Sequence, residues 1–223
     1  MKVTKILAAL VGGLPNTITL LIASFIFSSL IGIGVAFLSL QDDKVGKSVS
    51  RVYIGLVRGT PPLLMLLLTY YGLPKLLSFI GIDSNNWAKI IFGIFGLSVG
   101  WGGYMAEAFR SAYLSVDEGQ IKAAYSVGMT GETALREIIL PQAFLIAIPN
   151  VENLLIGLLK ATSLVYVIGL ADMYQNASNL SNVNQGVYQL KIFIILALIY
   201  WVLASLIEWG FRTYQSHFAH VEA

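Results

Sequence analysis

The chain has 223 residues, of which 57% are hydrophobic and only 12% are charged, and its formal charge at pH 7 is +2. A soluble domain carries about 25% charged residues. Half that share, with a mean hydropathy of +0.75, indicates an integral membrane protein. The small net charge, with basic residues scattered along the chain, argues against a nucleic-acid partner. The absence of cysteine excludes disulfides, thiolate metal sites and cysteine nucleophiles.

Apolar runs of about twenty residues predict about five transmembrane helices, and so an all-α integral membrane protein with a single domain over residues 1–223. The first, Leu14–Leu40, contains no ionisable residue and is too long for the core of a cleaved signal peptide. The others are expected at 52–77, with an interruption at Pro61 and Pro62, and at 88–110, 138–159 and 188–211. We expect Pro149 and Glu152 to break the fourth span, and 175–189 to form an external loop.

The distribution of positive charge sets the expected orientation, because cytoplasmic loops carry an excess of Lys and Arg. With five spans, every arginine falls on the side of the 41–51 loop, the 111–137 loop and the C-terminal tail. That side is therefore expected to be the cytoplasm, with the N-terminus outside. The opposite side carries only lysines: Lys2, Lys5, Lys75, Lys89 and Lys191.

The third expected span carries closely spaced glycines, namely Gly93, Gly96, Gly100, Gly102 and Gly103. Small residues at helical spacing let helices approach closely. These glycines could serve packing within the chain or form a dimer face, and packing within the chain is favoured. At the end of this span Glu107 and Arg110 have the i, i+3 spacing of a salt bridge.

A short polar stretch separates the third and fourth spans. Gly119 is expected to end or redirect the chain, and a helix is expected from Gln120, with Ala123 and Ala124 at its centre. Gly128 would end that helix in the left-handed conformation, and Thr130 or Gly131 would start the next. The helix could lie on the bilayer or dock in a groove of a soluble protein. A bilayer-bound helix should carry more bulky apolar residues and more lysine than this one, which favours the groove.

Polar residues in and after the fourth span are candidates for contact with a solute, since a charge inside a membrane is costly. Asn153 and Lys160 are two turns apart and share a face, with Glu152 nearby. A carboxylate and an ammonium lining one cavity would complement an amino acid. Alternatively, Glu152 and Lys160 pair with each other or with neighbouring helices. Further lining candidates are Thr162, Ser163 and Tyr70.

Two short motifs resemble binding sites but do not meet the requirements of those sites. Gly46, Lys47 and Ser48 resemble the end of a phosphate-binding loop, but Gln41 occupies the place of the first glycine and no strand precedes it. The chain therefore needs an ATPase from elsewhere if ATP drives it. His217 and His220, with Glu222 beyond, are expected to form a solvated tail and no metal site.

The order of several short motifs is similar to one family along the whole chain. They are 58–64 (RGTPPLL), 71–74 (YGLP), Ala106-Glu107 with Arg110, 119–128 (GQIKAAYSVG), 138–143 (IILPQA) and 159–164 (LKATSL). In this order they resemble the polar amino acid permeases of bacterial ABC importers, the histidine, glutamine, arginine and cystine group. Three positions depart from the family pattern: Lys122 in place of Glu, Met65 in place of Gln, and Ala161 in place of Asp.

This resemblance implies a type I ABC permease fold with a short cytoplasmic coupling helix, in a bacterial cell membrane. It implies a second permease copy or a paralogue, partner ATPase subunits that bind ATP and Mg, an extracytoplasmic binding protein, and a polar amino acid substrate, with cystine favoured. The chain itself would have no catalytic residue and no cofactor. The residues that the resemblance assigns to contact with the ATPase are Gly119, Gln120, Lys122, Ala123, Ala124 and Gly128.

Two other classes of protein are weighed against this one. A secondary transporter would need coupling carboxylates in the membrane and often internal repeats, but only Glu152 is deep and no repeat is visible. A membrane scaffold that recruits a soluble partner would have no need of Pro149 and Glu152 inside a span.

Overall fold

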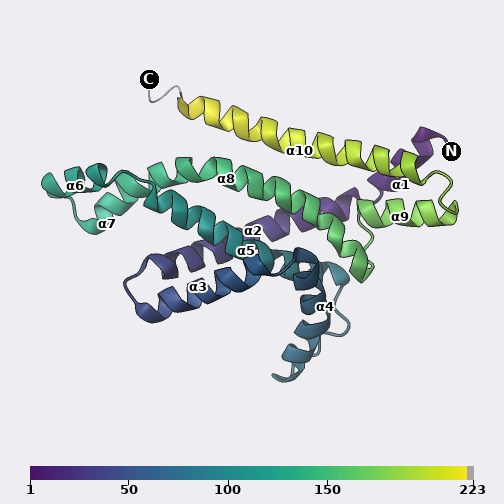
Figure 1. Cartoon of the computed structure of the whole chain (residues 1–223), viewed down its shortest axis with the longest axis horizontal. Coiled ribbons are helices and arrows are strands. Elements are labelled where there is room, and N and C mark those ends of the chain that lie inside the picture. Colours follow the sequence, from purple (N-terminus) through teal and green to yellow (C-terminus); the bar gives the residue numbers. More distant parts are fainter. Residues whose placement is uncertain (220–223) are drawn as a thin grey trace.

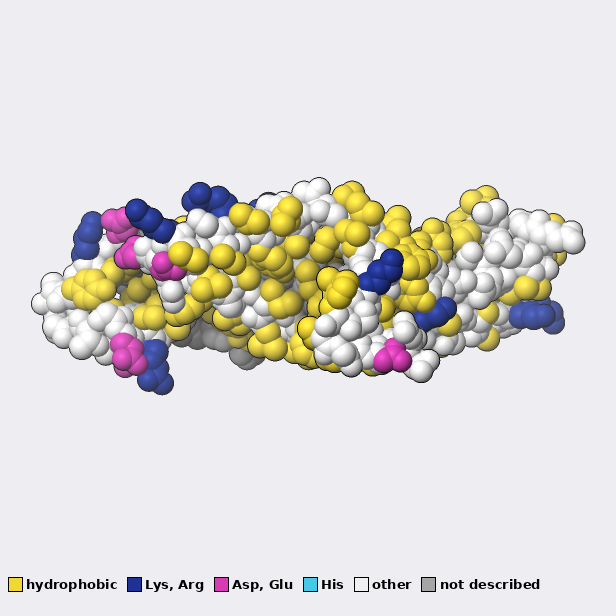
Figure 2. Space-filling model, turned by 90° about the horizontal axis from the view of Figure 1, so that it is seen from below, with side chains coloured by type: hydrophobic (Ala, Val, Ile, Leu, Met, Phe, Trp, Pro, Cys, Tyr) yellow, Lys and Arg dark blue, Asp and Glu magenta, His cyan; other side chains and the backbone are white. Residues whose placement is uncertain are grey.

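The computed structural model describes residues 1–219 and is helical throughout its ordered elements. Four helical stretches are long and apolar enough to cross a membrane, or five if one bent pair counts as a single span. Figure 1 shows α2, α5, α8 and α10 extending along the long axis, with the N-terminus at one end and α6 at the other. Hydrophobic side chains cover much of the surface between charged groups towards the two ends (Figure 2). The prediction of an all-α multi-pass membrane protein is confirmed.

The first span is α2 (Leu14–Leu40), preceded by the short helix α1 (Val3–Val11). The predicted bounds of α2 are confirmed. Its buried positions recur every three or four residues: Thr17, Leu20, Leu21, Ser24, Ser28, Gly32 and Ala36. An opposite stripe is exposed: Ile22, Ile26, Leu30, Ile33 and Phe37. One face therefore packs on α5 while the other is left for lipid or a partner.

The centre of the bundle is α5 (Lys89–Leu114), which contacts α2, α3, α4 and α8. Its glycines permit that packing. A Cβ at Gly102 would lie 2.6 Å from side-chain atoms of Ile31 and Tyr53, and one at Gly96 would lie 3.3 Å from the Cα of Leu66. The interpretation that these glycines serve packing within the chain is confirmed at both positions. Gly100 differs, because open space lies beside it.

The predicted interruption of the second span at Pro61 and Pro62 is confirmed. The span consists of α3 (Lys44–Gly59) and α4 (Pro62–Ser78), which meet at 107°. Pro61 and Pro62 cause the bend, because a residue before proline is excluded from the helical region, and Thr60 accordingly has φ −99° and ψ 129°. The prolines were expected to interrupt the span, but the sequence did not predict that α4 would turn away from the bundle, as Figure 1 shows.

The fourth span also differs from its prediction. It runs from α7 (Gly131–Ala134) through a π-helical turn, η1 (Leu135–Ile139), into α8 (Leu140–Ala161) and the 3₁₀ turn η2 (Thr162–Ile168). α8 passes through Pro149 without a break, so the predicted break is wrong. A proline removes one backbone hydrogen bond, and packed neighbours in a membrane bundle allow the helix to continue. The irregular turn lies instead at η1, near the start of the span.

The remaining elements are α6 (Glu118–Ser126), α9 (Met173–Val183) and α10 (Gln189–Ala219). The polar stretch 175–189 was predicted to be a loop, but α9 occupies most of it. Asp172 explains the helix, since its carboxylate accepts hydrogen bonds from the backbone amides of Tyr174 and Gln175 at 3.2 and 2.8 Å. The predicted tail at His220 and Glu222 lies outside the described residues, as does the side chain of His217.

Candidate functional site: an exposed helix at one end of the bundle and polar residues in the fourth span

The short helix α6 begins at a side-chain cap. Asp117 accepts a hydrogen bond from the backbone amide of Gly119 at 2.6 Å, and Glu118 pairs with Lys122 at 3.1 Å on the exposed surface. The chain therefore changes direction at Asp117, and Gly119 lies inside α6. The prediction that Gly119 ends or redirects the chain is wrong, because the capping carboxylate two residues earlier already starts the helix.

The end of α6 follows the predicted geometry. Gly128 has φ +83°. Its amide donates to the carbonyl of Tyr125 at 3.0 Å, and the amide of Met129 donates to the carbonyl of Ala124 at 3.1 Å. This pair of bonds is a Schellman motif, which requires a left-handed residue at this place. Thr130 then caps α7 by accepting from the amide of Thr133 at 3.2 Å, so the predicted second helix is confirmed.

The position of α6 leaves most of its surface uncovered. Ala124 is 5% exposed and holds the helix in place, with help from an apolar cluster of Val116, Ile139 and Ala143 against which Ile121 packs. Gly119, Gln120, Lys122 and Ala123 are exposed. Figure 1 shows α6 and α7 at the far end of the molecule from the N-terminus. A rigid, capped helix thus presents a face of small and polar residues beyond the bundle.

The predicted solute-contacting residues of α8 are only partly brought together. Glu152 is half-buried and Lys160 is exposed, and neither side chain makes a hydrogen bond or an ion pair with any residue in 1–219. The alternative that they pair with each other is not realised, since the helix is continuous and eight positions separate them. Asn153 is exposed, and its amide donates to the carbonyl of Pro149 at 3.0 Å. Glu152 and Lys160 therefore keep their charges available.

Three further candidates are less open. The Thr162 side chain is buried and donates to the carbonyl of Leu159 at 2.7 Å, and Ser163 donates to the carbonyl of Lys160 at 2.7 Å. Tyr70 lies on α4, with its ring edge-on to that of Phe92 at 5.5 Å. These contacts are structural, so solute contact at Tyr70, Thr162 and Ser163 stays a prediction.

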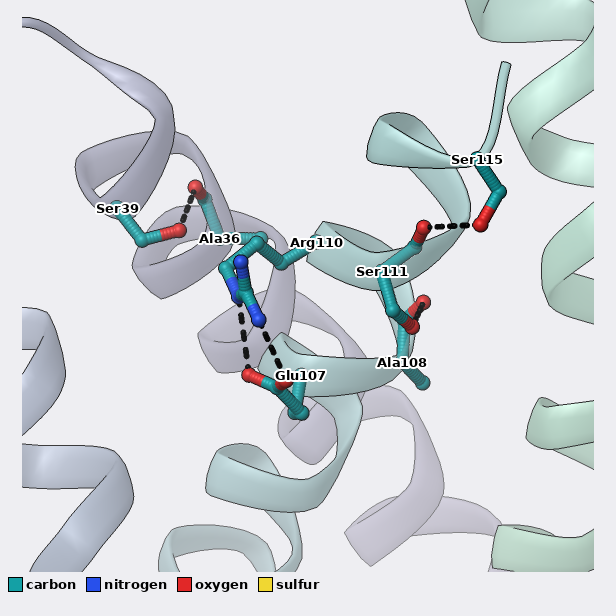
Figure 3. Close-up of polar contacts among 7 residues, drawn as sticks. All are labelled: Ala36, Ser39, Glu107, Ala108, Arg110, Ser111 and Ser115. Carbon is teal, nitrogen blue, oxygen red and sulfur yellow. Dashed lines mark hydrogen bonds and ion pairs between the residues drawn. The ribbon is translucent and has the colours of Figure 1, made fainter. Parts of the chain in front are cut away.

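The predicted salt bridge at the end of α5 is confirmed. Arg110 Nη2 and Nε lie 2.7 and 3.0 Å from the two carboxylate oxygens of Glu107 (Figure 3). The pair borders a cavity of about 450 Å³ that reasoning from the sequence missed, lined by Ser39, Lys47, Ser50, Arg51, Ile54, Gly55, Glu107 and Arg110. A signal was available in α3, where Lys47, Arg51 and Arg58 share one face at helical spacing.

The pKa values of two carboxylates outside the spans differ from their usual range. Burial raises the pKa of Asp172 to about 6, although hydrogen bonds from the amides of Gln175 and Tyr174 oppose that effect. Asp43 caps α3, and the amides of Gly46 and Val45 hold its pKa below the usual value. Of the two, Asp172 alone carries an unfavourable charge at neutral pH.

Four to five apolar spans, with a capped helix exposed between the third and fourth, define a multi-pass membrane protein. The chain belongs to the family of binding-protein-dependent transport system inner membrane components, whose pattern matches residues 28–218. Within that family its relatives are amino acid permeases, so this chain is the permease subunit of an amino acid ABC transporter.

The relatives are similar over most of their length. The L-cystine transport system permease protein TcyL of Bacillus subtilis is 35% identical over 199 residues, 89% of this chain and 82% of that protein. The probable amino-acid permease protein YxeN of Bacillus subtilis is 39% identical over 194 residues, 87% of this chain and 84% of that protein. The histidine/lysine/arginine/ornithine permease HisQ of Salmonella typhimurium is 34% identical over 161 residues, 70% of this chain and 71% of that protein.

Solved structures agree with the fold. A chain from the crystal structure of an amino acid ABC transporter with histidines superposes with a TM-score of 0.84 and 31% identity, over 97% of this chain and 100% of the other. A chain of the inward-facing MetNI methionine ABC transporter has a TM-score of 0.77 at 19% identity, over 97% of this chain and 99% of the other, which supports the fold alone.

Proposed function

We propose that this permease pairs with a second copy or a paralogue to form the membrane path of an ATP-driven importer for a polar amino acid, with cystine the leading candidate. Support for the substrate comes from TcyL and TcyB, two L-cystine transport system permeases that are each 35% identical to this chain. ATP and Mg are bound by partner ATPase subunits, and an extracytoplasmic binding protein delivers the amino acid.

The observation that carries this proposal is the exposed, doubly capped α6 at one end of the bundle. We assign Gln120, Lys122 and Ala123 to contact with a groove on the ATPase, since small and polar side chains allow close approach without demanding burial in lipid. Gly119, Ala124 and Gly128 set the shape of that contact. The α6 end is then cytoplasmic and the N-terminus lies outside.

The transport cycle that follows is alternating access. Closure of the ATPase pair moves α6, and the spans respond as rigid bodies that open the path to one side at a time. Glu152, Asn153 and Lys160 offer opposite charges and an amide to an amino acid in transit, with Tyr70, Thr162 and Ser163 as further candidates. Covalent chemistry is confined to the partner.

The test is the ATPase activity of the reconstituted permease and ATPase with the binding protein and, in turn, each of the twenty amino acids and cystine. We expect stimulation by cystine or by a small set of polar amino acids. No stimulation by any of them in a complex that is verified as assembled would overturn the proposal.

A further inference from the structure

The polar groove between α2, α3 and α5 lies towards the α6 end of the bundle, away from every residue assigned to solute contact above. Its volume of about 450 Å³ is within the range of small-molecule sites. Three of its lining side chains are cationic, Lys47, Arg51 and Arg110, and one is anionic, Glu107. The local charge is therefore positive by two, from three cations and one carboxylate.

The three cationic side chains differ in their hydrogen-bond and ion-pair partners. Arg110 forms the two-pronged pair with Glu107 described above. Lys47 reaches only Asp42, a fully exposed carboxylate, at 3.4 Å. Arg51 makes no hydrogen bond or ion pair within residues 1–219. A guanidinium has five N–H donors in a fork that matches a carboxylate. Arg51 is therefore the strongest unpaired hydrogen-bond donor for an anion among the side chains that line the groove.

The neutral side chains of the groove present oxygen lone pairs. Ser39 Oγ donates to the carbonyl of Ala36 at 2.7 Å, as Figure 3 shows, and Ser50 Oγ donates to the carbonyl of Lys47 at 3.0 Å. With their hydrogens committed to the backbone, both hydroxyls act towards a ligand as acceptors. Together with Glu107 they suit an N–H donor. The groove thus offers donors to an anionic group and acceptors to a cationic one.

The side of α3 that faces the groove argues for a ligand from water rather than a lipid. The apolar stripe Val45, Val49, Val52 and Leu56 is exposed. At 3.6 residues per turn, Lys47 and Arg51 lie roughly 130–170° around the helix from this stripe. Acyl chains that cover the stripe would therefore leave the cationic face turned away from them.

The cationic face also continues into the bundle. Arg58 lies two turns beyond Arg51, with its guanidinium carbon 5.7 Å from the ring centre of Tyr104. Tyr104 in turn lines a small cavity with Thr60 and Trp101. From Lys47 to Arg58 the row extends about 16 Å along α3. The row leads from the α6 end towards the middle of the spans.

We infer that this groove is a cytoplasmic release site, in which Arg51 and Lys47 hold the α-carboxylate of an amino acid and Glu107 meets its α-ammonium. The inference rests on the proposed function, which makes the α6 end cytoplasmic and the cargo an amino acid. It adds a substrate class: the positive charge of the groove favours amino acids with neutral or acidic side chains over those with cationic side chains.

The experiment uses the absence of cysteine from the chain. Gly55 lines the groove, and a Cβ there meets no atom within 4 Å, so Gly55→Cys places a thiol in open space. The full chain is expressed with its ATPase, and inside-out membrane vesicles are treated with an anionic or a cationic methanethiosulfonate reagent. The positive groove should favour the anionic reagent by about tenfold. Arg51→Gln should remove most of that ratio and Arg51→Lys should keep it.

The control is Ser216→Cys on α10, which is exposed and outside the groove. Its reagent ratio should not respond to Arg51→Gln. An equal response of both thiols, or no charge preference at Gly55→Cys, would overturn the inference.

Ligand protection identifies the occupant. Cystine or a neutral amino acid at ten times its Kd should slow labelling of Gly55→Cys about tenfold, and arginine should protect less. Inorganic phosphate and added phosphatidylglycerol serve as the other anion sources, and protection by either one alone would overturn the inference. Uptake by the same transporter separates the two proposals: intact uptake without protection rejects the release site only, and absent uptake rejects the proposed function.

Discussion

Gly13, at the start of α2, lies against the backbone of Asp172, so closely that a Cβ at position 13 would overlap the carbonyl group of Asp172. Hydrogen bonds flank this contact, because Asn16 donates to the carbonyl of Ala171 at 2.8 Å and Thr17 accepts from the amide of Met173 at 3.3 Å. The contact joins the first span to the segment between the last two, on the side away from α6.

We expect Gly13→Ala to destabilise the protein by about 1–3 kcal/mol, the usual cost of inserting a methyl group into tight packing. Thermal unfolding of the detergent-solubilised chain, followed by intrinsic fluorescence, gives the measurement. Gly34→Ala on the same helix is the control, since nothing lies within 4 Å of its added Cβ. A loss at Gly34 as large as that at Gly13 would contradict the packing argument.

The pH dependence of stability should change in Asp172→Asn. The folded pKa of Asp172 is about 6 against an ordinary value of 3.8, so between these values the folded state binds more protons than the unfolded state. The contribution of Asp172 to the free energy of unfolding is therefore most favourable below about pH 4 and falls as the pH rises to about 6. Asparagine also caps a helix but does not ionise. The variant should be more stable than the native chain by about 1–3 kcal/mol at pH 7.5.

Melting temperatures of both proteins at pH 7.5 and pH 4.5 provide the comparison. The advantage of Asp172→Asn should shrink at the lower pH. An advantage that is independent of pH would show that the charge of Asp172 is not its source.

Gly128→Asp should uncouple the transporter. The left-handed conformation at φ +83° disfavours a side chain, and a carboxylate adds charge where α6 meets its proposed groove. Uptake should fall at least tenfold, about 1.4 kcal/mol or more in coupling free energy, while the amount of protein in the membrane is retained. Gly128→Asn is the matched control, because asparagine tolerates this conformation without charge. Normal uptake by the aspartate variant would reject the coupling assignment.

Glu152→Gln should reduce uptake without reducing expression. Glu152 has no ion-pair partner among residues 1–219, so its neutralisation leaves no orphaned charge in the bundle. A charged hydrogen bond to the cargo is worth about 1.5–3 kcal/mol, which corresponds to a loss of roughly 10–100-fold in uptake. The measurement is the initial rate of amino acid uptake divided by the amount of permease in the membrane. Equal losses of rate and amount would assign Glu152 to structure.

Membrane orientation can be tested with single cysteines on opposite ends. Ser126→Cys should react from the cytoplasm, and Val183→Cys, at the end of α9, from outside. Val183 is 82% exposed, whereas the neighbouring Ser181 is buried and would not report on sidedness. Impermeant reagent added to intact cells should label position 183 only. Labelling of position 126 instead would reverse the topology.

Local chemistry accounts for the parts of the fold that the sequence predicts well. The bounds of α2 follow from a run without ionisable residues, and the end of α6 follows from a glycine at positive φ, a conformation that most other residues disfavour. Each depends on a few adjacent positions. Proline was a less reliable guide, since it bent the chain at Pro61 and did not break α8 at Pro149. The outcome depends on which neighbours pack around it.

Features that depend on distant contacts were missed. α9 needs the buried carboxylate of Asp172 as its cap. Its first turn is also bound to the other end of the sequence, because Asn176 donates to the carbonyl of Ala9 and the amide of Met173 donates to Thr17. The groove at Arg51 needs α5 to bring Glu107 and Arg110 beside α3. The row of cations on α3 was visible in the sequence, but the face against which it would lie was not.

The unbroken path through Pro149 has a mechanical consequence. From Gly131 to Ile168 the chain is helical over 38 residues, about 57 Å at 1.5 Å per residue. A hinge at Pro149 would let the two halves of α8 move separately, and its absence makes α8 a single stiff rod on the side of η1 away from α6. A displacement at the α6 end is then transmitted to Glu152 and Lys160 as rotation and translation of one body. The irregular turns of this path lie at the two ends of α8: the π-helical turn η1 on the side of α6, and the 3₁₀ turn η2 beyond Ala161.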